Sequence, residues 1–70
     1  MKQATEQEFN NLVHKYSETE ISEYSKNFVF KGVVSDGYTY FTAMNVLIAV
    51  FKIDSKEAKE IADKCWKNCI

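Results

Sequence analysis

Apolar residues near the start of the chain recur with the period of an α-helix. They are Phe9, Leu12, Val13 and Tyr16. The spacing of i, i+3, i+4 and i+7 places these four side chains on one helical face. Thr5 and Glu8, at the start of this stretch, have the spacing of a capping box. In this motif the side chain of each residue accepts a hydrogen bond from the other's backbone N–H. The pattern therefore predicts a first helix over residues 5–16.

The next apolar stretch keeps helical spacing through Ile21, Tyr24 and Phe28. Gly32 can end this second helix, because glycine adopts the left-handed conformation without a steric penalty. The strongest turn signal in the chain follows at Ser35–Gly37. The pattern thus predicts a second helix that ends near Gly32 and a turn a few residues later.

The same turn also allows a β-hairpin. Residues 28–34 and 38–42 are rich in aromatic and β-branched residues on either side of an Asp-Gly pair, which is a hairpin signal. Against it, Gly32 would lie in the middle of the first strand, and the apolar run continues into residues with a helical pattern. A hairpin over Phe28–Phe41 is kept as the alternative to helices in this region.

Two further helices are expected in the second half of the chain. The third begins at Thr39 or Thr42 and runs to Ile53, with apolar residues on nearly every side. A helix of this kind is usually buried or sandwiched, so it is either a central core helix or a helix partly covered by a partner. Asp54 and Glu57 then have capping-box spacing, and a single apolar stripe follows them. This stripe predicts a last helix over residues 55–69.

Composition and charge narrow the class of protein. A chain of 70 residues with 46% apolar and 14% aromatic residues is typical of one globular domain over residues 1–70, not of a disordered tail. A net charge of −1 offers no basic stripe for nucleic acid. No apolar run approaches the roughly 20 residues of a membrane span, and the N-terminus lacks a signal-peptide core. We therefore expect a cytoplasmic protein without nucleic-acid or membrane partners.

Residues for catalysis or metal binding are few. His14 is the only histidine, and no nucleophile motif accompanies it. Cys65 and Cys69 lie at i, i+4 on one helix face, but a zinc site would need two more ligands. No glycine-rich phosphate loop is present. We therefore expect no enzymatic activity, no cofactor and no metal, and we interpret the two cysteines as small apolar residues of a reduced compartment.

A faint internal repeat with a period of 37 residues suggests two helix–loop–helix units. Apolar residues precede Ser17 and Asp54 at the same three offsets, and apolar residues occupy the eighth and thirteenth positions of each following segment. In the first unit these residues are Phe9, Val13, Tyr16, Tyr24 and Val29, and in the second unit they are Val46, Val50, Ile53, Ile61 and Trp66.

This repeat resembles the EF-hand family, specifically one lobe of a calmodulin-like protein or myosin light chain. The resemblance covers nearly the whole chain and implies an all-α, four-helix lobe. In the family, the eighth loop residues pair across a short β-bridge, which implies such a bridge between Tyr24 and Ile61. A helix containing Lys56–Lys59 after an apolar helix is also similar to the ribosomal stalk protein's C-terminal domain and to the ClpS adaptor, whose folds continue with strands.

Both loops depart from the calcium-binding pattern. A calcium loop needs oxygen ligands at positions one, three, five and twelve and a glycine at six. In the first loop Ile21 occupies position five and Phe28 occupies position twelve. In the second loop only Asp54 is a credible ligand, and Cys65 replaces the bidentate glutamate. We therefore expect that neither loop binds calcium, and either one can wind into helix instead.

The resemblance implies a calcium-independent light chain of an unconventional myosin. Its ligand would be an amphipathic, basic helix of the IQ type from the motor's neck, held in an apolar groove. Mapping the lobe onto the chain places this partner-binding groove at Val29, Val33, Val46, Leu47, Ala49, Phe51, Ile53, Trp66, Cys69 and Ile70. The groove floor is expected at Phe9, Val13 and Phe28, and a second contact at Met44, Leu47, Ile48 and Phe51.

Two alternatives stay open beside this function. Each groove residue can equally be ordinary core, because a lobe this small shares its core with its groove. The chain can also be a small, phage-like intracellular regulator or inhibitor. Such a protein would cap another protein with an α+β surface that carries the Phe28–Phe41 hairpin, or with its third helix.

Overall fold

The computed structural model describes residues 2–17 and 23–69, with side chains throughout except at 23, 24, 68 and 69. Its helices are α1 (Glu6–Tyr16), α2 (Glu23–Ser35), α3 (Tyr40–Phe51) and α4 (Ser55–Cys69). Within the described ranges the chain has no strand, and its one β-bridge joins Lys2 to Tyr38. The expected all-α class with four helices is confirmed for these ranges. The hairpin over residues 28–41 is wrong, because these residues form the end of α2, a turn and the start of α3.

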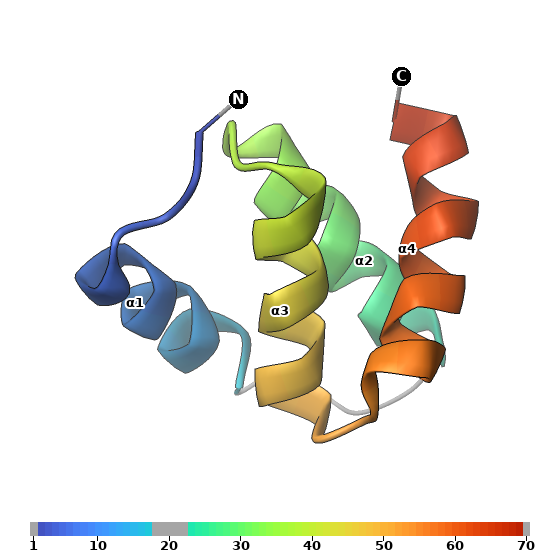
Figure 1. Cartoon of the computed structure of the whole chain (residues 1–70), viewed down its shortest axis with the longest axis horizontal. Helices are drawn as coiled ribbons and strands as arrows, with labels where there is room; N and C mark the ends of the chain where they lie inside the picture. The colour runs from blue at the N-terminus through green and yellow to red at the C-terminus, as the bar shows by residue number, and fades with distance from the viewer. Residues whose placement is uncertain (1, 18–22, 70) are drawn as a thin grey trace.

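The four helices enclose one apolar core. Helices α2, α3 and α4 pack against one another, and α1 packs against α3. In Figure 1, α3 lies in front of α2, with α1 on one side and α4 on the other. The surface area of 4643 Å² is close to the roughly 4,500 Å² expected for a compact monomer of this mass. The largest fully buried side chains are Val29, Phe30, Val33, Val46 and Leu47.

The helix starts follow the capping signals. The Thr5 hydroxyl accepts a hydrogen bond from the Glu8 N–H at 3.1 Å, and the Glu8 carboxylate accepts one from the Thr5 N–H at 3.0 Å. The capping box of α1 is thus confirmed. At the start of α4, the Asp54 carboxylate accepts a hydrogen bond from the Glu57 N–H at 2.8 Å. Both caps satisfy backbone donors that have no partner inside the helix.

Two predicted helix ends are displaced. Helix α3 ends at Phe51 instead of Ile53, because Lys52 adopts the left-handed conformation with φ 55°. Helix α2 continues to Ser35, past Gly32. A β-carbon at Gly32 would lie 2.6 Å from the hydroxyl oxygen of Tyr16. Gly32 therefore serves the close approach of α1 to α2, and the turn glycine is Gly37, with φ 97°.

Residues 2–5, here called the N-terminal segment, are anchored to the turn between α2 and α3. The Lys2 N–H donates to the Gly37 carbonyl at 2.8 Å, and the Thr39 N–H donates to the Lys2 carbonyl at 3.1 Å. The side-chain oxygen of Gln3 accepts hydrogen bonds from the hydroxyls of Thr39 and Thr42 at 2.8 and 2.9 Å. The segment therefore ties α1 to the start of α3.

Glu8 adds a charged contact to this anchor. Its carboxylate accepts hydrogen bonds from the Lys2 ammonium at 2.8 Å and from the Tyr38 hydroxyl at 3.1 Å, besides the Thr5 N–H. The Lys2 hydrogen bond, followed by the Thr5 backbone bond, lowers the pKa of Glu8 to about 2. The ionised form is thus favoured in the folded chain.

We expect Glu8 to make the stability of the fold depend on acid pH. Because folding lowers the pKa of Glu8, its stabilisation is fully present above the ordinary value of 4.5 and is lost as the pH falls from there towards about 2. Thermal melts in this window should show the Tm difference between wild type and Glu8→Gln shrinking with decreasing pH. Glu6→Gln, which removes a carboxylate of the same helical turn, is the control. A constant difference for Glu8→Gln would contradict the expectation.

Candidate functional site

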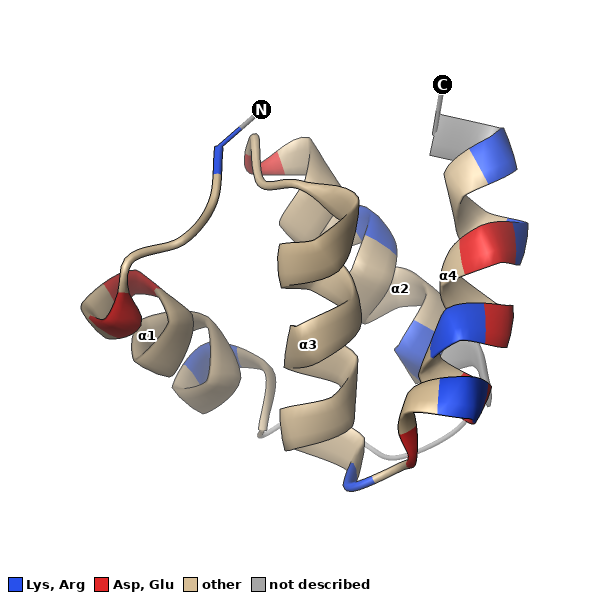
Figure 2. Ribbon diagram, in the orientation of Figure 1, with Lys and Arg blue, Asp and Glu red and all other residues tan. Residues whose placement is uncertain are grey.

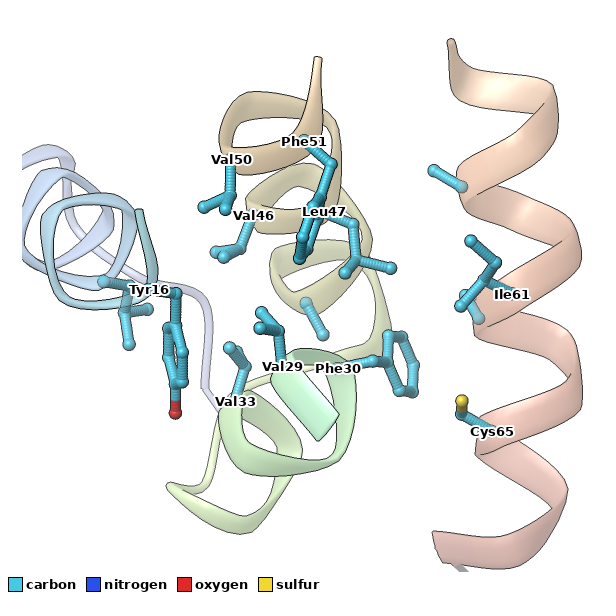
Figure 3. Close-up of a cluster of buried hydrophobic side chains, with 14 residues drawn as sticks. Tyr16, Val29, Phe30, Val33, Val46, Leu47, Val50, Phe51, Ile61 and Cys65 are labelled. Carbon is cyan, nitrogen blue, oxygen red and sulfur yellow. The ribbon is translucent and has the colours of Figure 1, made fainter. Parts of the chain in front are cut away.

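Half of the expected groove residues belong to the core. Val29, Val33, Val46 and Leu47 are fully buried, and Phe51 is nearly so. Figure 3 shows these side chains within the buried cluster, with Val33 and Val46 on the side of α1 and Leu47 on the side of α4. These five residues are therefore ordinary core, as the alternative interpretation expects, and they line no open groove.

The other expected groove residues have different surroundings. Ala49 is exposed on α3, while Ile53 and Trp66 are half-buried. The Cys69 side chain and Ile70 lie outside the described residues. Ala49, Ile53 and Trp66 are thus the expected groove residues that are accessible within the described part of the chain.

Of the three residues expected at the groove floor, two pack against the core and one does not. Phe9 and Val13 are half-buried and pack against the core. Phe28 does not, because its side chain is 57% exposed. Residues two apart in a helix point about 200° away from each other. Since Phe30 is fully buried, Phe28 necessarily faces solvent on the opposite side of α2.

The main candidate surface is the solvent-facing side of α3. It consists of Phe41, Met44, Asn45, Ile48 and Ala49, which we call the outer face of α3. Phe41 is 61% exposed, Asn45 and Ala49 are exposed, and Met44 and Ile48 are half-buried. Of the expected second contact, Met44 and Ile48 thus lie on this face, whereas Leu47 and Phe51 are core.

Helix α3 carries no charged side chain, in contrast to α4 beside it (Figure 2). A surface helix usually presents charged and polar residues to water. The outer face of α3 offers only the Asn45 amide as a hydrogen-bonding side chain. This face is therefore suited to contact with another apolar surface.

An aromatic cluster borders the outer face at its N-terminal end. The ring of Tyr40 makes edge-to-face contacts with Phe30, Phe41 and Trp66, at centroid distances of 6.0, 5.5 and 5.7 Å. The Tyr40 hydroxyl donates a hydrogen bond to Asp63 at 2.6 Å. Burial and then this hydrogen bond raise the pKa of Tyr40 to about 12, so the hydroxyl remains a neutral donor. Tyr40 thus fixes Trp66 and Phe41 on adjacent helices.

The region expected to form the second loop is helical. Only residues 52–54 connect α3 to α4, and residues 55–65 belong to α4. Tyr24 and Ile61 lie within α2 and α4, so the implied bridge between them is wrong. The described residues also hold no group of three or more His, Cys, Asp or Glu that could bind a metal ion. Asp54 acts as a helix cap here.

His14 and Cys65 are the remaining residues of reactive type whose side chains the structure describes. His14 is exposed on α1. Cys65 is buried, and its sulfur lies 3.4 Å from the side-chain oxygen of Asn27. Within residues 2–17 and 23–69, no helix combines the length and apolar content of a membrane span.

Comparisons with protein-family models, with curated proteins and with solved structures found no match to this chain.

Proposed function

We propose that the chain is a calcium-independent, non-catalytic protein-binding module of the light-chain type. Its ligand is an amphipathic, basic helix such as an IQ-type helix of a myosin neck. The observation that carries the proposal is the uncharged outer face of α3 with the exposed Phe41 ring beside Trp66. Exposed aromatic residues beside an apolar strip are typical anchors of protein interfaces.

The shape of this face favours a helical ligand. Its residues recur at i, i+3, i+4, i+7 and i+8 over two turns of α3. The apolar face of an incoming helix fits such a row by packing its ridges into the grooves of α3. The buried part of the expected groove, including Val29 and Leu47, can take part only if the helices separate. Binding at the outer face requires no such opening.

Apolar contact, not charge, is expected to supply most of the affinity. Among the acidic residues of the N-terminal region, Glu8 is already paired with Lys2. Exposed ion pairs contribute about 0–1 kcal/mol each and are screened by salt. The alternative function, a regulator that caps another protein with its third helix, would use the same face. The test of the light-chain function must therefore measure the binding of a helical peptide directly.

A synthetic amphipathic basic helix is expected to shift the fluorescence of Trp66, the only tryptophan. Phe41→Ala should weaken binding by about 10–100-fold, as expected for an aromatic anchor. Phe28→Ala, at a similarly exposed ring on α2, should leave the affinity within about twofold and is the matched control.

Raising salt from about 50 to 500 mM should weaken binding of the helix less than tenfold. Millimolar calcium should leave the affinity for the helix unchanged.

Three results would count against this function. The first is an unchanged Trp66 spectrum at saturating peptide with no heat by calorimetry. The second is equal loss of affinity for Phe41→Ala and Phe28→Ala. The third is a micromolar calcium affinity measured by calorimetry, which would contradict the assignment of calcium independence.

A further inference from the structure

The outer face of α3 is complementary to a second copy of itself, and we propose that the chain forms an antiparallel, two-fold symmetric dimer through this face. The proposal goes beyond the binding of a partner helix and does not depend on that ligand's identity. It rests on the order of large, small and polar residues along α3, and on the absence of charge there.

Residue sizes along α3 are complementary under a two-fold axis. In an antiparallel pair of identical helices, two residues that lie opposite each other have numbers that always add up to the same total. With Asn45 on the axis, Phe41 of one copy lies opposite Ala49 of the other. The exposed Phe41 ring thereby covers the smallest exposed position of the same face. Met44 and Ile48 form a second row along one side of the row Phe41, Asn45 and Ala49.

Asn45 is the polar residue of the face, and the axis gives it a partner. An amide side chain both donates and accepts hydrogen bonds. Two copies of Asn45 that meet on the axis can therefore satisfy each other reciprocally. A single asparagine within an apolar helix seam is a known determinant of register in paired helices. The exposed position of Asn45 leaves its amide available for this pairing.

Charge does not oppose the association. A two-fold axis brings identical surfaces together, so a charged residue at the centre would meet its own copy. The outer face of α3 avoids this, because α3 carries no charged residue (Figure 2). The net charge of −1 also keeps long-range repulsion between two copies small.

The area suggests a reversible dimer. A stable interface buries about 800 Å² per partner, which is about a sixth of the 4643 Å² surface of this chain. Met44 and Ile48 are already half-buried in the monomer, so the outer face supplies only part of that area. We therefore expect a dissociation constant on the order of 10–100 µM.

Sedimentation velocity from about 1 µM to 1 mM tests the proposal on the full chain. The wild type should shift from monomer to dimer over this range. Asn45→Asp and Asn45→Lys should each weaken association at least tenfold, because like charges then meet on the axis. An equimolar mixture of these two variants should restore a dimer. Asn11→Asp, at an exposed position on α1, is the matched control and should associate as the wild type does.

A second pair of variants tests the register without introducing charge. Ala49→Phe places two large rings opposite each other and should weaken association about tenfold. Combining it with Phe41→Ala exchanges the two sizes and should recover most of the loss. Circular dichroism of each variant confirms that the helices remain folded.

Three results would overturn the proposal. They are a wild type that stays monomeric at 1 mM, a dimer insensitive to both Asn45 variants, and a mixture of these variants that fails to associate. None of them affects the Trp66 titration with the amphipathic helix, which is carried out at low micromolar protein. Failure of the dimer and failure of the proposed function are therefore distinguishable.

Discussion

Leu47→Asp is expected to unfold the chain. Leu47 is fully buried in α3, and an unpaired carboxylate at such a site is destabilising by several kcal/mol. A domain of this size has a free energy of unfolding of roughly 4–10 kcal/mol, so one buried charge removes most of it. Far-UV circular dichroism and urea titration should show loss of helix or a large decrease in the denaturation midpoint.

Phe41→Asp is the control for this substitution. It places the same charge in the same helix, but at a ring that is 61% exposed. This variant should keep its helical spectrum and lose less than about 1 kcal/mol of stability. A folded Leu47→Asp variant would show that Leu47 is a surface residue, as the groove interpretation requires.

Phe30→Ala is expected to destabilise the fold by about 3–5 kcal/mol, whereas Phe28→Ala should change the free energy of unfolding by less than about 1 kcal/mol. Phe30 is fully buried and contacts the Tyr40 ring, while Phe28 is 57% exposed. Urea unfolding of the two variants gives both values. In a strand, residues 28 and 30 would share one face. Similar losses for both variants would therefore contradict the helical assignment of this region.

The helices could be predicted from local signals. The Thr5–Glu8 capping box and the apolar spacing after it marked α1 to within one residue. Asp54 marked the start of α4 in the same way. In both places the caps and the apolar period agree, and each signal lies within a few residues of the chain. Such agreement is what makes a helix predictable from sequence.

The candidate site was harder to predict, because α3 is apolar on all sides. The sequence pattern does not distinguish Leu47, which is buried, from Ile48, which is partly exposed. The positions of α1, α2 and α4 decide which side of α3 is covered. The same holds for Gly32, which was expected to end α2 but instead accommodates the Tyr16 hydroxyl from α1.

The N-terminal segment gave no signal at all in the sequence. Lys2 pairs with residues near Tyr38, about half the chain away. A single bridge of this kind has no period, no cap and no turn residue of its own. The side-chain oxygen of Gln3 is likewise matched to Thr39 and Thr42 only after the helices are in place.

This long-range anchor has a consequence for the order in which the molecule assembles. Helices α2, α3 and α4 are joined by short connections and pack on one another, so they can collapse as a local unit. The N-terminal segment and α1 precede their docking sites in the Gly37–Thr42 region along the chain. On a translating ribosome the N-terminal segment and α1 therefore cannot dock before residues 37–42 have been made. Because Lys2, Gln3 and Thr5 are exposed, these contacts are also of the kind that opens locally while the rest of a protein stays folded.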